Sequence, residues 1–496
     1  MILNRMRTAV LLLIVLNGSF DSSFLAAVQA RDLHVDPEAG DDAHDGVAKP
    51  VKSISRAIRF AGAGDTIHLR PVVYRDYAGF YEKHGEPGRP ITLEGHGATL
   101  DGADPLDPAE WKEVEPGLFR QDDLLRLDEA IIGRWFFLWD GRMNHMGRTS
   151  KGPSLPLKQP EELKPGEWTF VNDPTRQIEG SAQIFGAFYL RLPPGQKLAE
   201  AKISAPVRSA GVQFGGKNSH LTIRNLTATH PYNDGFNIHG SCRDVVFENI
   251  RAIDCGDDGI SAHDDCQYTV DGFVSTGNST GICDTGDSVT SYNRVFIRDC
   301  LGFDLYFLDT GRYSLSNAVV LSSAARTFMV TGRDKAESPC MLAMDNVYIR
   351  RERGENEVRV STNSRVTARR VSLLNLMFQA TGGEIELDHC FIGGTVPPAD
   401  PPTDKTANGP GSKIDFLLWK DVTWRGQGNL YDVGSLRFDK TTFTPATFAD
   451  FQRTTKSETD SAWRAVSVEQ PIPNGIGADL SRLKEQGLEI EPRERR

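Results

Sequence analysis

The chain has 496 residues, of which 39% are hydrophobic and 25% are charged, and its formal net charge is −11. This is the balance of a globular protein, and the negative charge argues against nucleic acid and against an anionic membrane surface as partners. A local basic cleft on an acidic body would still allow an acidic polysaccharide to bind.

The first 30 residues have the pattern of a secretory signal peptide. Arg5 and Arg7 precede the apolar run 9–16, and small residues follow it up to Ala30. The run is too short to span a bilayer as a helix, and no later stretch reaches about 18 apolar residues. We therefore expect a protein without a membrane anchor, exported to the periplasm or the extracellular space.

Residues 31–103 alternate between short strand patterns, glycine-rich turns and one helical pattern. Apolar residues recur at helical spacing over Ser53–Ala61, and Gly62 and Gly64 then stop the helix. The alternation over Asp65–Leu69 predicts a strand directly afterwards.

Residues 104–206 follow no period and predict a β-rich insertion beside the first coils. They contain four of the seven tryptophans of the chain, which are Trp111, Trp135, Trp139 and Trp168. We expect these side chains to form a separate hydrophobic core. The alternative is that they line a cleft in which sugar rings stack on aromatic faces.

Three segments between His220 and Gly311 repeat one plan. Each has an alternating apolar strand, a short polar turn, a second short strand and a Gly/Asp-rich corner, and a looser fourth copy lies between the second and the third. Ile223, Phe247, Val270 and Ile297 hold equivalent places, which gives a period of 23 to 27 residues. This period, built from short strands, indicates an all-β parallel solenoid, because stacked coils bury the apolar side that one repeat cannot. The helix near the N-terminus would then cover the open end of the first coil.

The repeat divides the rest of the chain into three parts. Regular coils are expected over 207–396, and a Pro/Gly-rich surface loop, a last coil and a short helix over 397–466. Residues 467–496 form a charged tail whose end is expected to be frayed.

The seven cysteines have two interpretations. Cys242 and Cys266 are 24 residues apart, which is one coil. They are either stacked, buried thiols or a disulfide, because adjacent coils lie about 4.8 Å apart. The sequence contains no CxxC pattern of a metal site.

The opening of the chain combines a Gly/Asp-rich loop over 35–46, the helix, Gly64–Ile67 and Tyr74. This order resembles the N-terminal cap and first coils of secreted right-handed β-helix proteins of the pectate-lyase-like superfamily. The resemblance implies a right-handed parallel β-helix, and it implies carbohydrate chemistry only loosely.

Two successive corners carry Asp234 and the pair Asp257–Asp258. Asp234 and Asp258 are one coil apart, so the three carboxylates should lie together on one face. They cannot all ionise normally, because like charges raise the pKa of one member. A protonated acid beside ionised carboxylates is what glycoside hydrolysis requires. The alternatives are that these residues only form turns, or that they clamp Ca²⁺.

The segment from Asn233 to Ser261 is similar to the catalytic coils of polygalacturonase-type glycoside hydrolases, whose motifs run N-T-D-G, D-D, G-H-G and R-I-K. The resemblance implies that Asp234, Asp257 and Asp258 supply the acid and activate water, with inversion. Asn233 and Asn237 are then candidates for substrate binding.

The chain departs from that pattern in two places. The coil that should carry G-H-G reads Ser279–Gly281, and no R-I-K follows. The groups that assist the acid and bind a uronate are therefore unassigned, and four basic residues downstream are candidates: Arg298, Arg312, Arg326 and Arg333. We assign Arg312, together with Asp309, to substrate binding.

His263 and Asp264 lie in a segment that resembles the Y-G-x-D-P-H-D/E motif of alginate C5-epimerases, which are also β-helices. His239 and His263 are 24 residues apart and should stack, and Asp309 is expected to continue their column. Two such histidines could act as base and acid on a sugar C5 proton, bind a divalent metal, or simply be exposed.

Three functions follow as hypotheses. The first is an exported, monomeric, polysaccharide-degrading glycoside hydrolase of polygalacturonase type that needs no cofactor. The second is a polysaccharide lyase or C5-epimerase acting on a uronan, with His263 or His239 as proton carrier and Ca²⁺ on the aspartates. The third is a non-enzymatic glycan-binding or surface protein, which predicts corner carboxylates scattered around the coil. No metal site is firmly predicted, and neither nucleic acid nor a membrane is an expected partner.

Overall fold

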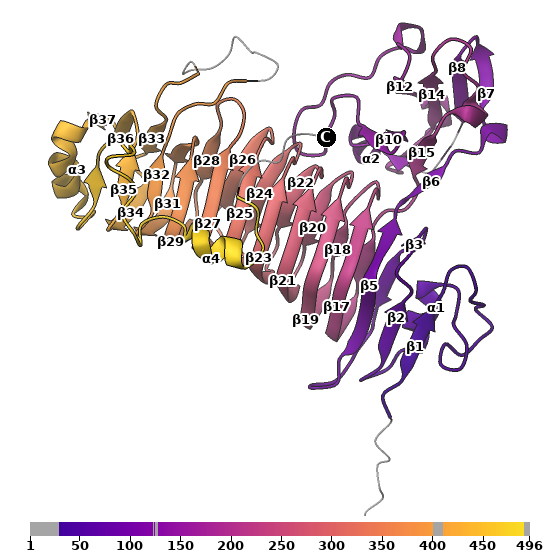
Figure 1. Cartoon of the computed structure of the whole chain (residues 1–496). Helices are drawn as coiled ribbons and strands as arrows, with labels where there is room; N and C mark the ends of the chain where they lie inside the picture. Colours follow the sequence, from indigo (N-terminus) through magenta and orange to yellow (C-terminus); the bar gives the residue numbers. More distant parts are fainter. Residues whose placement is uncertain (1–28, 123, 125–126, 400–409, 491–496) are drawn as a thin grey trace, which may run out of the picture.

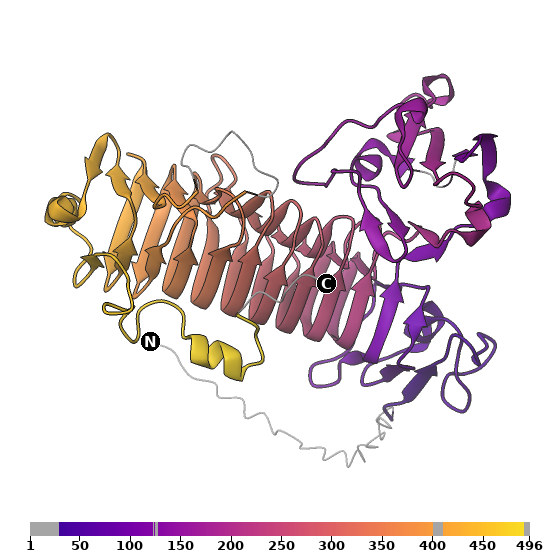
Figure 2. The ribbon, with the colours of Figure 1, turned by 45° about the horizontal axis from the view of Figure 1, so that its top comes forward.

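The computed structural model describes residues 29–122, 124, 127–399 and 410–490. Nearly all of the predicted signal peptide lies outside these residues. The protein is a right-handed parallel β-helix whose coils stack along one axis, with an antiparallel β-rich insertion beside its N-terminal end (Figures 1 and 2). Within the described part of the chain, no helix has the length and apolar character needed to cross a membrane.

The coils form two long sheets, A and B, and every strand pair in sheet A is parallel. Sheet A contains β1 (Asp32–Val35), β2 (Thr66–Leu69), β3 (Val73–Tyr74), β5 (Ile91–Asp101), β17 (Lys217–Thr229), β19 (Ser241–Ile253), β21 (Gln267–Thr276), β23 (Val289–Arg298), β25 (Arg312–Ser322), β27 (Cys340–Arg351), β29 (Ser364–Leu374), β31 (Gly383–Asp388), β32 (Phe391–Gly393), β34 (Val422–Gln427), β35 (Leu430–Asp432) and β38 (Ala462–Trp463). Sheet B contains β4 (Ala78–Tyr81), β16 (Val212–Gly215), β18 (Phe236–Ile238), β20 (Asp258–Ala262), β22 (Thr280–Asp284), β24 (Phe303–Asp309), β26 (Arg326–Gly332), β28 (Glu357–Val360), β30 (Met377–Ala380), β33 (Asp415–Leu418), β36 (Ser435–Phe438) and β37 (Thr441–Phe443).

The long strands of sheet A bend at one residue with positive φ, which is the short polar turn of the repeat. Asn225, Asn249, Asn317 and Asn346 hold this place at φ between 48° and 58°, a conformation that asparagine tolerates better than most residues. Their side chains also form a ladder: Asn249 Nδ2 donates to Asn225 Oδ1 at 3.3 Å, and Asn346 Nδ2 to Asn317 Oδ1 at 2.9 Å. Each coil therefore has three faces, two in sheet A and one in sheet B.

The register confirms the stacking of Ile223, Phe247 and Val270, but it corrects the next position. Val270 pairs with Tyr292, not with Ile297. Tyr292 is fully buried and its hydroxyl hydrogen-bonds Tyr268 at 2.8 Å. The repeat here is therefore 22 residues rather than 27. A search for aliphatic residues misses this position, because a tyrosine occupies it and its hydroxyl is hydrogen-bonded inside the core.

Helix α1 (Ile54–Phe60) confirms the predicted N-terminal helix. Ser53 caps it by accepting from the Arg56 amide, and Ile54, Ala57 and Ile58 are buried in the core of the first coils. At the other end, α3 (Phe448–Thr455) buries Phe448 and Phe451 and confirms the expected short helix.

The insertion consists of antiparallel strands that leave and rejoin the solenoid at one point. Its strands are β6 (Ala103–Pro105), β7 (Lys112–Glu115), β8 (Leu118–Asp122), β9 (Leu127–Asp128), β10 (Phe137–Trp139), β11 (Arg142–Asn144), β12 (Trp168–Asn172), β13 (Gln183–Ile184), β14 (Gly186–Arg191) and β15 (Ile203–Pro206), with α2 (Glu129–Gly133). The Val207 amide donates to the Gly102 carbonyl at 2.9 Å, and β5 pairs directly with β17. Trp111, Trp135 and Trp168 are buried in a core of their own, which confirms the separate hydrophobic core.

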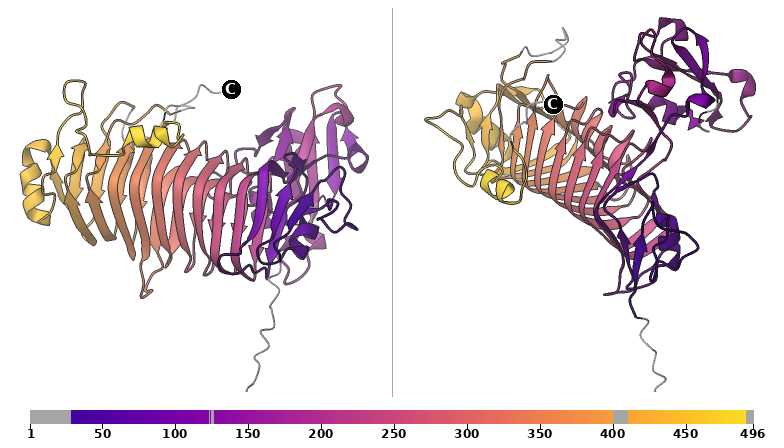
Figure 3. Two further views of the ribbon diagram at one scale, coloured as in Figure 1. Left: turned by 60° about the horizontal axis from the view of Figure 1, so that its bottom comes forward. Right: turned by 45° about the vertical axis from the view of Figure 1, so that its right-hand side comes forward.

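The charged tail is not frayed up to residue 490. Helix α4 (Leu480–Glu485) lies across sheet A (Figure 3), and Leu483, Leu488 and Ile490 bury themselves against outward apolar residues of β23, β25 and β27. These three apolar side chains hold the otherwise charged tail against the sheet and cover an apolar patch that would be exposed without it.

All seven cysteines are buried free thiols, as in the first of the two interpretations. Cys242 Sγ donates to the Gln267 carbonyl at 3.7 Å, and Cys266 Sγ donates to the Gly240 carbonyl at 3.4 Å. The two thiols that could have formed a disulfide thus donate hydrogen bonds to backbone carbonyl oxygens instead.

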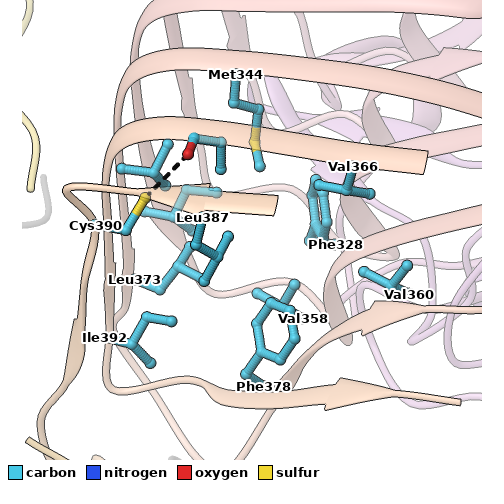
Figure 4. Close-up of a pocket in the computed structure, with 13 residues that line it drawn as sticks. Phe328, Met344, Val358, Val360, Val366, Leu373, Phe378, Leu387, Cys390 and Ile392 are labelled. Atoms are coloured by element: carbon cyan, nitrogen blue, oxygen red, sulfur yellow. Dashed lines mark hydrogen bonds between the residues drawn. The ribbon is translucent and has the colours of Figure 1, made fainter. Parts of the chain in front are cut away.

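The interior of the C-terminal coils contains a narrow apolar cavity (Figure 4). Its walls are aliphatic and aromatic side chains with the Cys390 thiol, and Cys390 Sγ donates to the Ala368 carbonyl at 3.4 Å. An apolar cavity of this kind gives neither water nor a sugar the polar partners it needs. A saccharide would therefore have to bind on the outer surface of the solenoid.

Completely buried carboxyl groups also lie in the interior, among them Asp284 and Asp304. Burial raises the pKa of Asp304 to about 7, and the nearby Ser322 and Arg351 offset this only in part. The group is therefore protonated in the folded chain at pH values where it is ionised in the unfolded chain.

We expect Asp304→Asn to make the protein less sensitive to alkaline pH. Since the folded pKa is raised, the folded state binds the extra proton, and this stability is lost as pH rises towards about 7. Between pH 5 and pH 8 the loss amounts to about 3 kcal/mol from this group. Melting temperatures across that range should fall less for the variant than for the parent. If the melting temperature of the variant fell as steeply as that of the parent, Asp304 would not be the group responsible. Asp244→Asn, which changes an exposed carboxylate, is the control and should behave like the parent.

Candidate active site

Three carboxylates converge at the corner that precedes β18 and β20. One oxygen from each of Asp234, Asp257 and Asp258 lies within 4.8 Å of the other two. The Asp258 amide also donates to Asp234 Oδ1 at 3.0 Å, because the corners are stacked in register. The predicted convergence is confirmed, whereas a scattered arrangement was the expectation for a non-enzymatic protein.

Two cations from the insertion cover this cluster. Lys151 Nζ lies 2.5 Å from Asp257 Oδ1 and 2.7 Å from Asp258 Oδ1, and Arg134 Nη1 donates to Asp257 Oδ2 at 2.8 Å. The aspartates are only 3% to 6% exposed. The loop that carries Lys151 rests on the corner before β24, where a Cβ on Gly152 would come within 2.8 Å of the Gly302 Cα. Only glycine allows this approach of two backbones.

The three carboxyl groups differ in their pKa values. Burial, reinforced by Asp257, raises the pKa of Asp258 well above its usual value and that of Asp234 to about 6. Burial also acts to raise the pKa of Asp257, but Lys151 and Arg134 outweigh it and hold that pKa below the usual range. As pH falls, Asp258 is therefore protonated before Asp257, so an acid and an ionised carboxylate can coexist in the cluster.

Asn237 belongs to the same network, and Asn233 contributes its backbone. Ser261 Oγ donates to Asp234 Oδ2 at 2.6 Å and lies 3.4 Å from Asn237 Oδ1, while Asn237 Nδ2 donates to Gln213. The Asn233 carbonyl accepts from the Asp257 amide at 3.0 Å. Both asparagines thus fix the positions of the carboxylates.

His239 and His263 stack, as predicted, on the same outer face of sheet B. Their ring centroids are 3.9 Å apart and the ring planes differ by 4°. Burial, the neighbouring His239 and Lys151 lower the pKa of His263 to about 4, and burial also lowers the pKa of His239. Both rings are therefore neutral at neutral pH and can accept a proton.

The structure does not bring Asp309 and Arg312 to the carboxylates. Asp258 pairs with Thr280 in the next coil, and Thr280 pairs with Phe303 at the start of β24. Asp309 is the last residue of β24, where its carboxylate accepts hydrogen bonds from the Thr285 hydroxyl and the Gly286 amide. Arg312 follows the next corner and lies on sheet A, in a shallow groove with Asp244 and Gln267.

Asp309 also does not continue the histidine column, because Ala262 pairs with Asp284 and Asp284 with Phe307. Thr285 and Leu308 therefore follow His263. The equal spacing of five residues misled the prediction because it was counted from Asp304, which lies one residue after Phe303, the residue in register with Asp258.

Of the other basic candidates, Arg326 is the one in the carboxylate column, since it pairs with Phe303. Arg298 bonds Asp299, and Arg333 bonds Asp309. The cations at the cluster itself, Arg134 and Lys151, were missed by sequence reasoning. They lie more than 100 residues before Asp257 and Asp258, which they contact, in a segment without periodicity.

An aromatic pair beside the cluster was missed as well. Tyr306 stacks on Phe303 at 4.4 Å with ring planes 17° apart, and it stands two coils from Ser261 on the outward row of sheet B. Its ring is half-buried. The outward position follows from the alternation of β24, but no motif marks it.

The cluster does not fit Ca²⁺ while Lys151 remains in place. The ammonium group contacts two of the three carboxylates, so a calcium ion would compete for the same oxygens. Lys151 supplies the positive charge that a bound cation would otherwise supply.

No known family model matches the chain, and no curated protein matches its sequence. Among solved structures, the chain is similar to XylC in complex with xylose, at 13% identity and a TM-score of 0.48, over 90% of this chain and 86% of that one. It is also similar to a glycoside hydrolase at 8% identity and a TM-score of 0.42, over 93% of this chain and 99% of that one. A rhamnogalacturonan lyase is similar at 9% identity and a TM-score of 0.35, over 92% of this chain and 99% of that one. Likenesses this distant do not by themselves indicate a function.

Proposed function

We propose that the protein is a polysaccharide-degrading enzyme, a glycoside hydrolase whose acid and base come from the carboxylate cluster. The observation that carries the proposal is the convergence of three buried carboxyl groups with unlike surroundings, because Asp257 lies between two cations while Asp234 contacts neither. Asp258 is the general acid that protonates the leaving oxygen, and Asp257 with Asp234 activates water.

The substrate path is the outer face of sheet B. Tyr306 offers an apolar ring face to a sugar along that row, and Lys151 stands where the sugar must enter, because its ammonium covers Asp257 and Asp258. The Lys151 side chain is 23% exposed, and its long stem can turn away from the carboxylates when a saccharide binds. The secretory pattern of the first 30 residues supports action outside the cytoplasm, and we propose a monomer.

A second candidate, a lyase or C5-epimerase acting on a uronan, is favoured by the histidine pair. His239 and His263 are neutral, and Lys151, which acts on His263, can offset the charge of a uronate. Either imidazole could remove the C5 proton. Calcium would be expected to assist only if it displaced Lys151.

Product analysis on a panel of neutral and acidic polysaccharides separates these functions. Hydrolysis is expected to yield new reducing ends without ultraviolet absorbance, and activity should withstand a chelator. Absorbance that grows with the reducing ends would show elimination instead. Altered proton-coupling patterns at C5 without chain cleavage would show epimerisation, and no product from any polysaccharide would contradict both enzymatic functions.

A further inference from the structure

Three histidines stack on the outer face of sheet A at its N-terminal end, away from the candidate active site. They are His34 in β1, His68 in β2 and His96 in β5, which are neighbouring strands (Figure 1). Ring centroids are 5.3 Å apart between His34 and His68, and 5.2 Å apart between His68 and His96. His96 takes a positive φ of 51° in the bend of β5, which turns its side chain back over His68.

Two ring nitrogens face each other in this stack. His68 Nδ1 and His96 Nε2 are 2.9 Å apart. Two imidazoles that bind one tetrahedral Zn²⁺ at about 2.0–2.1 Å hold their nitrogens about 3.3 Å apart. Zn²⁺ binding would therefore require this separation to grow by a few tenths of an ångström and both rings to tilt towards the ion, which replaces the hydrogen bond between them.

The opposite nitrogen of each ring faces a carboxylate. His68 Nε2 lies 3.0 Å from Asp32 Oδ1, and His96 Nδ1 lies 3.8 Å from Glu94 Oε1. Metal-binding histidines usually donate their second N–H to such a group, which fixes the tautomer that leaves the lone pair on the metal side. Asp32 favours the Nε2–H tautomer of His68, so His96 Nε2 donates the hydrogen bond to His68 Nδ1 while no ion is bound. Metal binding at His96 Nε2 would leave the proton of that ring on Nδ1, the nitrogen that faces Glu94.

Glu94 is held in place for this role. Its side chain is 7% exposed, Arg224 Nε donates to Oε2 at 2.6 Å, and Asn225 Nδ2 donates to Oε1 at 2.9 Å. The His96 backbone amide also donates to Oε1 at 2.9 Å. The carboxylate is therefore fixed by the fold before any ion arrives.

We propose that His68 Nδ1 and His96 Nε2 bind a divalent transition-metal ion of the Zn²⁺ class, oriented by Asp32 and Glu94. Neutral imidazoles select Zn²⁺, Cu²⁺ or Ni²⁺ over Ca²⁺ and Mg²⁺, which prefer oxygen ligands. Water or an external ligand completes the coordination, since both rings are partly exposed. The ion ties β2 to β5, and the proposal does not depend on the hydrolase assignment.

The test is calorimetric titration of the chelator-treated full chain with ZnCl₂. His96→Asn, which keeps a residue suited to positive φ, and His68→Gln should each weaken binding at least tenfold, and Asp32→Asn should weaken it about tenfold. Zn²⁺ should raise the melting temperature of the parent but not of His96→Asn. His84→Ala, a histidine that bonds Ser219 instead, should behave like the parent.

Two results would overturn the proposal. One is a parent chain without saturable Zn²⁺ binding, which would mean that the two rings only share a hydrogen bond. The other is unchanged binding in both His96→Asn and His68→Gln, which would place the ion elsewhere, for example at His239 and His263. Since each readout is binding or stability, failure here would leave the hydrolase proposal untouched.

Discussion

Asp258→Asn is expected to lower the rate of polysaccharide cleavage by about 10³-fold, with kcat falling far more than KM changes. Asparagine keeps the shape of the carboxyl group but has no proton to give to the leaving oxygen. The parent should lose activity as pH rises through the elevated pKa of Asp258, because the acid then becomes ionised. That alkaline limb should be missing from the residual activity of the variant.

Asp244→Asn is the matched control, since Asp244 is a carboxylate on sheet A whose side chain is 73% exposed. It should retain full activity and the parent pH profile. If Asp258→Asn stayed active while His263→Gln lost activity, proton abstraction by the histidine would replace hydrolysis as the mechanism. Initial rates of reducing-end release over a pH series measure all three variants.

Lys151→Met is expected to destabilise the fold by about 3–5 kcal/mol, the usual result of removing one partner of a buried ion pair. Methionine fills much of the same space but leaves Asp257 with Arg134 alone and Asp258 without a cation. Without Lys151 the folded-state pKa values of these carboxyl groups rise, so the loss should grow as pH rises. Denaturant unfolding at acidic and alkaline pH measures it.

Two further variants make the Lys151 result specific. Lys197→Met changes an exposed lysine of the same insertion, 80% exposed in its side chain, and should leave stability nearly unchanged. The double variant Lys151→Met/Asp258→Asn should lose less than the sum of the single changes, because it removes a carboxyl group that the lysine had stabilised. Additive losses would show that the two groups do not interact.

The architecture was predictable because it depends on local periodicity. Apolar alternation and the 24-residue spacing placed Asp234 beside Asp258 and His239 beside His263, and the register agrees. The same reasoning placed Ile297 where the register has Tyr292, and it misplaced Asp309 because Asp304 lies one residue after the position in register with Asp258. Spacing alone cannot count residues through a corner of unknown size.

The cations of the site were not predictable in the same way. Arg134 and Lys151 reach the aspartates through the tertiary placement of the insertion, and nothing in their own neighbourhood is periodic. The effect on the site is large, since these two charges decide which carboxyl group ionises. Sequence reasoning therefore located the carboxyl groups and missed the groups that set their protonation.

The junction between Gly102 and Val207 has a consequence for how such a site can change. Because β5 pairs directly with β17, the insertion of about a hundred residues is joined to the solenoid at two neighbouring backbone positions, Gly102 and Val207. The three aspartates of the site belong to the solenoid, and Arg134 and Lys151 belong to the insertion. Exchanging the insertion would change the net charge at the carboxylate cluster without altering any coil of the solenoid.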